Sequence, residues 1–186
     1  MLCWKKKGAI LTLGLVLAVL ALIFPLSLPV SAAPIVSPDG WAWQNPLPQG
    51  NVLLDVWGNS ASDVFAVGLH GTILHCDGSS WNSMESGTTE HLGGIWGSSS
   101  DDVFATGESG TILHYDGTSW SEMASSTTNS LYGVWGSSSS DIFAVGDSGT
   151  IVHYDGTSWS PMTSGISFWL HGIWGSSSDD VFAVGF

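Results

Sequence analysis

From about residue 40 onward, the chain alternates short apolar runs with short polar runs. In the stretch Leu131–Met162 the apolar runs are LYGVWG, DIFAVG, TIVHYD and SWSPM, and clusters of Ser, Gly and Asp separate them. Runs of this length, rich in Val, Ile, Phe, Tyr and Trp, predict β-strands, and no window carries the apolar stripe of a helix. Consecutive apolar residues, as at Ile142–Val145, favour strands covered on both faces. The pattern therefore predicts four short strands, which we denote a to d.

The whole pattern repeats every 39 residues. Three full units span 57–95, 96–134 and 135–173, a partial unit spans 174–186, and the segment from Trp41 aligns with the last strand of a unit. Four short antiparallel strands in roughly 40 residues are typical of a β-propeller blade. A parallel β-helix is the main alternative, but it needs shorter rungs and would not contain two tight glycine-containing hairpins in each unit. The period is marked by four Trp-Gly pairs: Trp57-Gly58, Trp96-Gly97, Trp135-Gly136 and Trp174-Gly175.

The units at the two ends are incomplete. We expect fifteen strands between residues 41 and 186, one fewer than four complete four-stranded blades require. This count favours a partial sequence whose parent continues with more copies of the repeat. The alternative is a chain that closes only by oligomerising. Taken as it stands, the chain is expected to form an open arc whose exposed edges promote self-association.

The turns between the strands have simple physical explanations. Asp-Gly pairs separate strands c and d, and they tolerate the positive φ that tight hairpins need. Ser and Asp clusters separate strands a and b, where their side chains can cap backbone amides. Cys76 stands where other units have Tyr115 and Tyr154, so we expect a small buried residue rather than a reactive thiol.

The first residues predict export. Residues 1–32 combine a cationic start, an apolar run and small residues before Ala32, which is the layout of a signal peptide cleaved after Ala32. Residues 33–40 are then expected to form a linker, and we expect the protein to be secreted or held at the cell surface. The alternative is an uncleaved membrane anchor, because the run from Gly8 to Val30 is long enough to span a bilayer. Pro25 and Pro29 interrupt the end of that run.

The charge of the chain limits its partners. Its only cations are Lys5, Lys6 and Lys7, whereas all 16 carboxylates follow them, so the part beyond the signal peptide has a formal charge of −16. Proteins bind nucleic acids by neutralising phosphates with Lys or Arg, so we expect no nucleic-acid partner. Anionic membrane surfaces are excluded for the same reason, and a membrane contact is expected only if the signal segment stays uncleaved.

Three runs, DVFAVG, GTILHYDGTSW and LYGVWGSS, resemble the repeats of bacterial extracellular β-propellers. The nearest groups are the Asp-box (BNR-type) and photosystem-assembly-factor-like propellers, and HYDGTSW has echoes of kelch and tectonin repeats. An Asp-box has one residue between its Asp and Gly, whereas Asp116 and Gly117 are adjacent. A kelch unit has Gly-Gly after strand b, whereas Asp147 follows Gly146. The resemblance, over residues 41–186, implies a fold and not an activity.

The sequence predicts no catalytic residue. Sialidases share the Asp-box propeller, but they bind a sugar carboxylate with arginines, which this chain lacks. Most acidic residues recur in every unit, and so do His75, His114 and His153, which favours structural roles over catalysis or metal binding. No cofactor is expected. A Ca²⁺ ion at Asp101-Asp102 or Asp179-Asp180 is the remaining possibility, because Ca²⁺ prefers oxygen ligands.

Positions that differ between units fall in the b–c turns and in the links from strand d to the next strand a. Both connections are expected on the same rim, because neighbouring antiparallel strands alternate in direction. Variation on one rim favours a ligand surface there, or else weaker packing constraints. We therefore predict an exported, non-enzymatic binding or scaffold module for a neutral carbohydrate or a protein. The alternative is a hydrolase or lyase with catalytic residues in blades outside this sequence. The candidate ligand-binding residues are Trp169, Phe168, His171, Tyr132, His91, Glu90, Glu108 and Asp147.

Overall fold

The computed structural model describes residues 3–6, 39, 41–44 and 50–186. The chain divides into two compact units, Met1–Asn45 and Pro46–Phe186. In the first unit, β1 (Cys3–Lys6) pairs antiparallel with β2 (Trp41–Gln44). The sequence analysis predicts the strand at β2 but not its pairing. The predicted signal peptide and linker lie mostly outside the described residues, so cleavage after Ala32 stays a prediction. Within the described part of the chain, no helix is long and apolar enough to cross a membrane.

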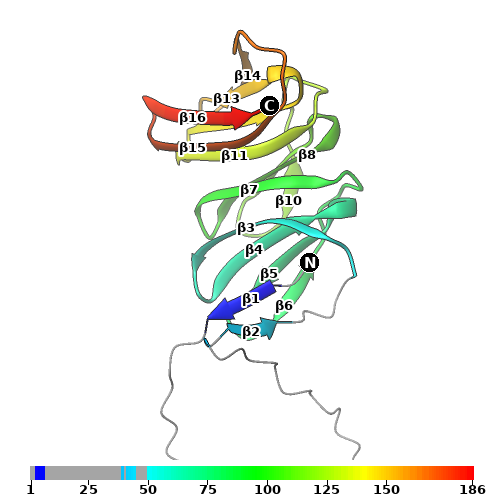
Figure 1. Cartoon of the computed structure of the whole chain (residues 1–186). Helices are drawn as coiled ribbons and strands as arrows, with labels where there is room; N and C mark the ends of the chain where they lie inside the picture. The colour runs from blue at the N-terminus through cyan, green and yellow to red at the C-terminus, as the bar shows by residue number, and fades with distance from the viewer. Residues whose placement is uncertain (1–2, 7–38, 40, 45–49) are drawn as a thin grey trace, which may run out of the picture. The chain divides into compact units, whose positions relative to one another are not determined.

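The second unit is a series of antiparallel sheets (Figure 1). The sheets follow the 39-residue period, but strand a of each begins four residues before the start of the predicted unit, at Leu53, Leu92, Leu131 and Leu170. Three sheets have four strands in sequence order, and the last has two. This confirms the all-β propeller fold. The first blade contains β3 (Leu53–Ser60), β4 (Asp63–Gly68), β5 (Ile73–Cys76) and β6 (Trp81–Met84). The second contains β7 (Leu92–Ser99), β8 (Asp102–Gly107), β9 (Ile112–Tyr115) and β10 (Trp120–Glu122). The third contains β11 (Leu131–Ser138), β12 (Asp141–Gly146), β13 (Ile151–Tyr154) and β14 (Trp159–Met162), and a partial blade contains β15 (Leu170–Ser177) and β16 (Asp180–Gly185).

The third blade spans Leu131 to Met162, the stretch whose pattern predicts it. Its first strand is longer than the run LYGVWG and contains two irregularities in register, at Leu131/Gly133 and Gly136/Ser138. Such bulges insert an unpaired residue and increase the local twist, and the apolar pattern did not predict them. The same irregularities recur in the other blades.

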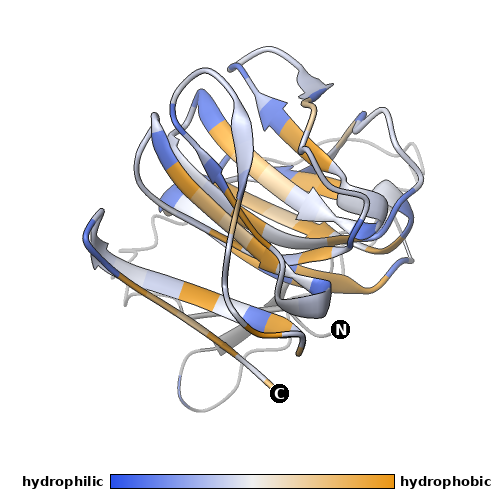
Figure 2. Cartoon of the chain, turned by 90° about the horizontal axis from the view of Figure 1, so that it is seen from above, coloured by the Kyte–Doolittle hydropathy of each residue, from blue (hydrophilic) through white to orange (hydrophobic). Residues whose placement is uncertain are grey.

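The core lies between the blades rather than inside one of them. One cluster joins Phe65, Val67 and Ile73 of the first blade to Leu113 and Trp120 of the second. An equivalent cluster joins the second blade to the third. This arrangement explains why the strands are apolar at consecutive positions, since the second and third sheets each contact a neighbouring sheet on both faces. Apolar residues follow the strands and polar residues gather at the turns (Figure 2). Cys76 is buried, as predicted, and is a free cysteine.

The repeated Trp-Gly pair is a contact between neighbouring blades. A Cβ atom on Gly97 would lie 2.7 Å from Cη2 of Trp57, which belongs to the preceding blade. Gly136 and Gly175 stand in the same relation to Trp96 and Trp135. The glycine leaves space for the indole ring of the previous blade, so the Trp and the Gly must recur together with the period of the blade.

Candidate functional site

Each b–c turn is a short 3₁₀ turn: η1 (Leu69–Gly71), η2 (Glu108–Gly110) and η3 (Asp147–Gly149). These turns bind to the d–a links through the backbone. Gly71 N–H donates to Glu90 O at 2.8 Å, and Glu108 N–H donates to His91 O at 2.9 Å. A Cβ on Gly71 would lie 2.0 Å from Thr88 O, so the link passes directly over the turn. The b–c turns and d–a links therefore lie on one rim, as predicted. We call residues 69–71, 85–91, 108–110, 124–130, 147–149 and 163–169, together with the adjoining Tyr132, His171 and Phe186, the variable rim.

Three predicted candidates form an aromatic cluster at the boundary between the third and the partial blade. The ring of Tyr132 stacks on His171 with centroids 4.9 Å apart, and Trp169 lies 6.5 Å from Tyr132 and 6.1 Å from His171. Phe186 joins the same cluster, since its ring stacks on His171 at 5.0 Å. The sequence analysis missed Phe186, although in the 39-residue register it takes the b–c turn position of Asp147. The side chain of Trp169 is 49% exposed, so the cluster is accessible to a ligand.

Two acidic candidates lie beside this cluster. The hydroxyl of Tyr132 donates to Oδ1 of Asp147 at 2.7 Å. The pKa of Tyr132 is raised by burial, then by the hydrogen bond to Asp147 and its charge, with a smaller contribution from the charge of Glu108. The phenol therefore remains a protonated donor at neutral pH, with carboxylates from two successive blades nearby.

His91 and Glu90 form a second group at the boundary between the first two blades. Nδ1 of His91 accepts from the backbone N–H of His70 at 2.9 Å, and the two imidazole rings meet edge to face at 4.9 Å. Accepting at Nδ1 places the proton of a neutral His91 on Nε2. Oε2 of Glu90 accepts from the hydroxyl of Ser109 at 3.1 Å. Phe168 is 65% exposed and makes no ring contact with the described residues of either group. The candidates therefore lie on one rim but in two groups.

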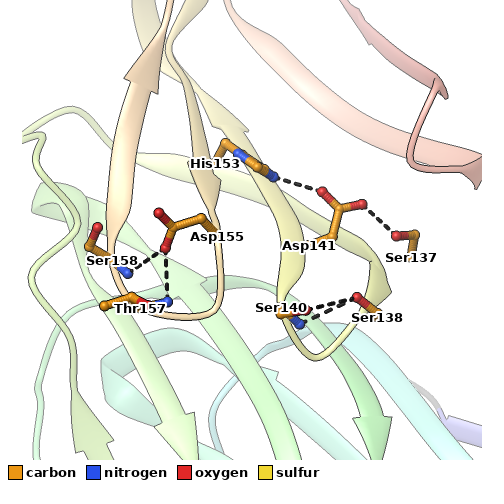
Figure 3. Close-up of polar contacts among 8 residues, drawn as sticks. All are labelled: Ser137, Ser138, Ser140, Asp141, His153, Asp155, Thr157 and Ser158. Atoms are coloured by element: carbon orange, nitrogen blue, oxygen red, sulfur yellow. Dashed lines mark hydrogen bonds and ion pairs between the residues drawn. The ribbon is translucent and has the colours of Figure 1, made fainter.

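The opposite rim, made of the a–b and c–d turns, is uniform. In the third blade Asp141 accepts from Ser137 through Oδ2 and lies 2.7 Å from His153 Nε2 through Oδ1 (Figure 3). The imidazole also stacks on Phe143 at 4.4 Å. The residue types match those of a hydrolytic triad, but the carboxylate lies between the other two groups. The hydroxyl is not hydrogen-bonded to the imidazole, which therefore cannot act as its base.

The same Asp–His pair recurs in the other complete blades, at 2.8 Å for His75–Asp63 and for His114–Asp102. Its recurrence indicates a structural latch that joins strand b to strand c. The first blade shows what the latch requires. Asn59 replaces the serine there and donates instead to Ser100 of the second blade at 3.0 Å. As a result, Oδ2 of Asp63 is buried without a partner among the described residues.

The c–d turns also use their carboxylates internally. Oδ1 of Asp155 accepts from the backbone N–H of Thr157 at 2.8 Å and of Ser158 at 2.9 Å (Figure 3). These bonds, that from Ser158 first, hold the pKa of Asp155 below its usual value. Gly156 follows with φ of +90°, as predicted for an Asp-Gly hairpin. The uniform rim is therefore held together by its own acidic side chains.

A third class of acidic residue escaped the sequence analysis. Asp55 takes the place of Gly94 and Gly133 in strand a, and the 39-residue alignment alone could have identified this exception. Its carboxylate accepts from the backbone N–H of Ile95 in the next blade at 2.9 Å and from its neighbour Val56 at 2.8 Å. Burial raises its pKa above the ordinary value. Both oxygens are engaged, so Asp55 joins two blades rather than presenting a carboxylate to a ligand.

Within the described part of the chain, no group of three or more His, Cys, Asp or Glu side chains is placed to hold a metal ion. Of the residues considered for Ca²⁺, Asp101 accepts from Ser99 at 2.6 Å and Asp180 accepts from Ser176 at 2.6 Å. The prediction of no cofactor, with Ca²⁺ as its alternative, therefore stays untested. Two open hollows, of about 660 and 400 Å³, lie along the d–a links and contain none of the candidate residues in their walls.

No family model matches the chain, and no curated protein matches it. It is similar to solved structures. One is YCF48 bound to a D1 peptide, with a TM-score of 0.60 and 19% identity over 85% of this chain and 55% of that chain. Another is YCF48 from Cyanidioschyzon merolae, with a TM-score of 0.60 and 16% identity over 72% and 48%. A third is an ancestral GH74 enzyme, with a TM-score of 0.60 and 16% identity over 77% and 24%.

These similarities establish the propeller fold alone. The chain spans about half the length of the two YCF48 structures and about a quarter of the GH74 enzyme. The comparison supports the β-propeller part of the predicted resemblance. It does not address the bacterial, extracellular or Asp-box parts, which stay predictions.

Proposed function

We propose that this chain is an exported, non-enzymatic binding module that holds a segment of another protein on its variable rim. The observation that carries the proposal is the aromatic cluster of Tyr132, Trp169, His171 and Phe186, beside the carboxylates of Asp147 and Glu108. Partly exposed aromatic rings supply large contact areas at low cost in conformational entropy, which is what protein recognition surfaces use.

The charge distribution favours a cationic segment. No Lys or Arg follows Lys7, so no such side chain within the blades neutralises the carboxylates of the rim. Most carboxylates of the uniform rim accept hydrogen bonds from the chain itself, whereas the carboxylate of Glu108 accepts none from the part of the chain that the structure describes. A Lys or Arg side chain could contact the face of Trp169 or Tyr132 and a carboxylate together. The solved structure of YCF48 bound to a D1 peptide is a precedent, in another protein, for a peptide ligand.

The same fold is compatible with a second class of ligand and with an enzymatic activity. A neutral carbohydrate could also stack on exposed rings, and it would not need the carboxylates. A hydrolase resembling the GH74 enzyme would need two carboxylates about 5–9.5 Å apart around a bound sugar. Asp55, the carboxylate that departs from the repeat on strand a, is engaged by two backbone amides, which does not favour that role.

The test is a selection of displayed random peptides on the purified chain, followed by affinity measurements on the enriched sequences by fluorescence polarisation. We expect enrichment of Lys or Arg next to an apolar residue, and weakening of at least about tenfold by Trp169→Ala. The matched control is Trp174→Ala, because Trp174 is a similarly exposed tryptophan (60%) outside the rim.

Equal affinity of wild type and Trp169→Ala, or equal loss in both variants, would contradict the assignment to the rim. Enrichment of acidic peptides would contradict the cationic partner. Binding of soluble neutral oligosaccharides in place of any peptide would show that the carbohydrate alternative is the correct one.

A further inference from the structure

The link between the first two blades is fastened to its b–c turn by a pair of histidines. The backbone N–H of His70, on η1, donates to Nδ1 of His91 at 2.9 Å, and the two imidazole rings meet edge to face at 4.9 Å. The corresponding pairs in the next two repeats are Ser109–Ser130 and Ser148–Trp169. No hydrogen bond joins either of these pairs in the part of the chain that the structure describes. The histidine fastening is therefore a feature of one link and not of the repeat.

This hydrogen bond requires a neutral His91. A backbone N–H group can only donate, so Nδ1 of His91 must carry a lone pair and no proton. An imidazolium is protonated on both nitrogens and has no acceptor left. Protonation of His91 would therefore set two N–H groups against each other where the hydrogen bond had been. The bond exists in one protonation state of the side chain and is lost in the other.

The recurring histidines respond to a proton in the opposite way. His75, His114 and His153 each face an aspartate through Nε2, at 2.7 or 2.8 Å. A protonated ring still donates to a carboxylate, and its charge strengthens the hydrogen bond. Mild acid therefore leaves the three Asp–His bonds in place, while it removes the bond at His91.

The turns and the link around His91 carry three titratable groups. The exposed ring of His70 comes from η1. Glu90 precedes His91 on the link, and its Oε2 accepts from a serine hydroxyl of η2 at 3.1 Å. Glu108 begins η2, and its backbone N–H donates to the carbonyl oxygen of His91 at 2.9 Å. A protonated His91 would thus adjoin a second imidazole that takes up protons in the same pH range, with carboxylates on the neighbouring elements as its acceptors.

The strands beside His91 add no free acceptor or charge. β7, which continues from His91, carries no titratable side chain. β3 and β11 flank β7 and carry one titratable group each, Asp55 and Tyr132. Asp55 accepts from the backbone N–H of Ile95, and Tyr132 donates to Asp147. The response of this link to pH therefore depends on the two histidines and the two glutamates.

We infer that the hydrogen bond between His70 and His91 is a pH-sensitive switch on the link between the first two blades. It is closed while His91 is neutral, and it opens as the pH falls through the range in which histidine takes up a proton, about pH 8 to 5. Opening frees the N–H of His70 and leaves the bond from Gly71 N–H to Glu90 O, at 2.8 Å, between η1 and the link. The switch changes the variable rim between the first two blades, and it does not depend on peptide binding at the aromatic cluster.

The test is NMR spectroscopy of the full chain labelled with ¹⁵N. Long-range spectra of the imidazole nitrogens are expected to show Nδ1 of His91 without a proton at about pH 7.5. The hydrogen-exchange protection of the His70 amide, corrected for the intrinsic pH dependence of exchange, is expected to fall at least about tenfold between about pH 7.5 and pH 5. The internal control is the amide of Asp147, which donates to the carbonyl oxygen of Ser130, a group that does not titrate. Its protection should stay constant.

The matched variant is His91→Asn, whose side-chain oxygen can stand in for Nδ1 and accept the same bond without taking up a proton. We expect the His70 amide of this variant to keep its protection across the pH range, whereas His91→Ala should lose it at both ends. A proton on Nδ1 of His91 at neutral pH, constant protection in the wild type, or an equal fall in wild type and His91→Asn would overturn the inference. Because the measurement reads one amide at the boundary between the first two blades, its failure leaves peptide binding at Trp169 separately testable.

Discussion

The two rims of the blades use the same residue types for opposite purposes. On the uniform rim, Asp141 and Asp155 of the third blade are engaged by the chain's own serine, histidine and backbone N–H groups. On the variable rim of the same blade, the carboxylate of Asp147 accepts one hydrogen bond, from Tyr132, next to exposed aromatic rings. A carboxylate that is fully engaged holds the blade together, and one that is not remains available to a partner. The environment of the acid, rather than its presence, therefore separates scaffold from candidate site.

The largest expected difference is in stability. Asp141→Ala removes the partner of both Ser137 and His153, so we expect a loss of about 2–3 kcal/mol in the free energy of unfolding. Its matched variant in the same blade, Asp147→Ala, removes one exposed hydrogen bond, and we expect a loss below about 1 kcal/mol. Urea unfolding followed by tryptophan fluorescence measures both values. Equal losses would show that the two rims do not differ in this way.

A second difference between the two rims is expected in their contributions to stability at acidic pH. Backbone N–H groups, those of Ser119 and Ser158 first, hold the pKa values of Asp116 and Asp155 below the ordinary value of 3.8. A lowered folded pKa stabilises the protein fully above the unfolded value, and this contribution is lost as the pH falls below about 3.8 toward the folded value. Asp116→Asn with Asp155→Asn should therefore flatten the acid side of a plot of stability against pH.

The control for the acid experiment is Glu90→Gln with Glu108→Gln on the variable rim. These carboxylates accept no backbone hydrogen bond from the described residues, so the double variant should keep the wild-type loss of stability below pH 4. Urea midpoints between about pH 2.5 and 6 give the comparison. If the two double variants respond alike, the turn caps of the uniform rim do not carry the acid sensitivity.

A smaller effect on stability is expected in the first blade, where Asp63 of the uniform rim lacks one hydrogen bond. Asn59→Ser restores the hydroxyl that other blades supply, and it offers a donor to the orphaned Oδ2 of Asp63. We expect a gain of about 0.5–1.5 kcal/mol in unfolding free energy, reduced by loss of the Asn59–Ser100 hydrogen bond. Thermal unfolding of the variant measures the net change. A net loss would mean that the contact of Asn59 with the second blade outweighs the latch.

The smallest effect is expected at the exposed aromatic residues. Phe168 is 65% exposed, so Phe168→Ala should change the unfolding free energy by less than about 0.5 kcal/mol. Trp169→Ala removes contacts with Tyr132 and Phe186 but no buried core, and a loss below about 1 kcal/mol is expected. Larger losses in the urea-unfolding measurement would place these residues in the core rather than on a binding surface.

The sequence predicted the fold well because a repeat presents the same evidence several times. The Trp-Gly period, the Asp-Gly hairpins and the apolar runs of Leu131–Met162 each recur and agree. The bulges in strand a did not follow from the pattern, since they depend on pairing across the sheet. The helical form of the b–c turns also did not follow, because Glu108-Ser109-Gly110 is compatible with several turns and does not specify the left-handed conformation that Ser109 adopts.

The candidate site was predicted in outline. Comparison of repeats placed Tyr132, Trp169 and His171 on one rim, and the structure brings their rings together. The spacing of the residues could not show that His91 and Glu90 form a separate group at the boundary between the first two blades, because this depends on which blades are neighbours. Phe186 and Asp55 were missed for another reason. Phe186 was not compared with Asp147, its counterpart in the b–c turn, and Asp55 was not compared with Gly94 and Gly133, which hold its position in the next two blades. The ligand could not be predicted, because the residues that differ between repeats share no pattern that identifies what they bind.

We propose that the variable rim binds a ligand and that the uniform rim stabilises the blades. Hydrogen–deuterium exchange of the full chain, with and without a peptide enriched in the display selection, distinguishes the two rims. We predict slower exchange on peptide binding in residues 124–130, 147–149 and 163–169, and unchanged exchange at the a–b and c–d turns of the same blades. Slower exchange confined to the turns around Asp141 and Asp155 would place the ligand on the opposite rim and contradict the account.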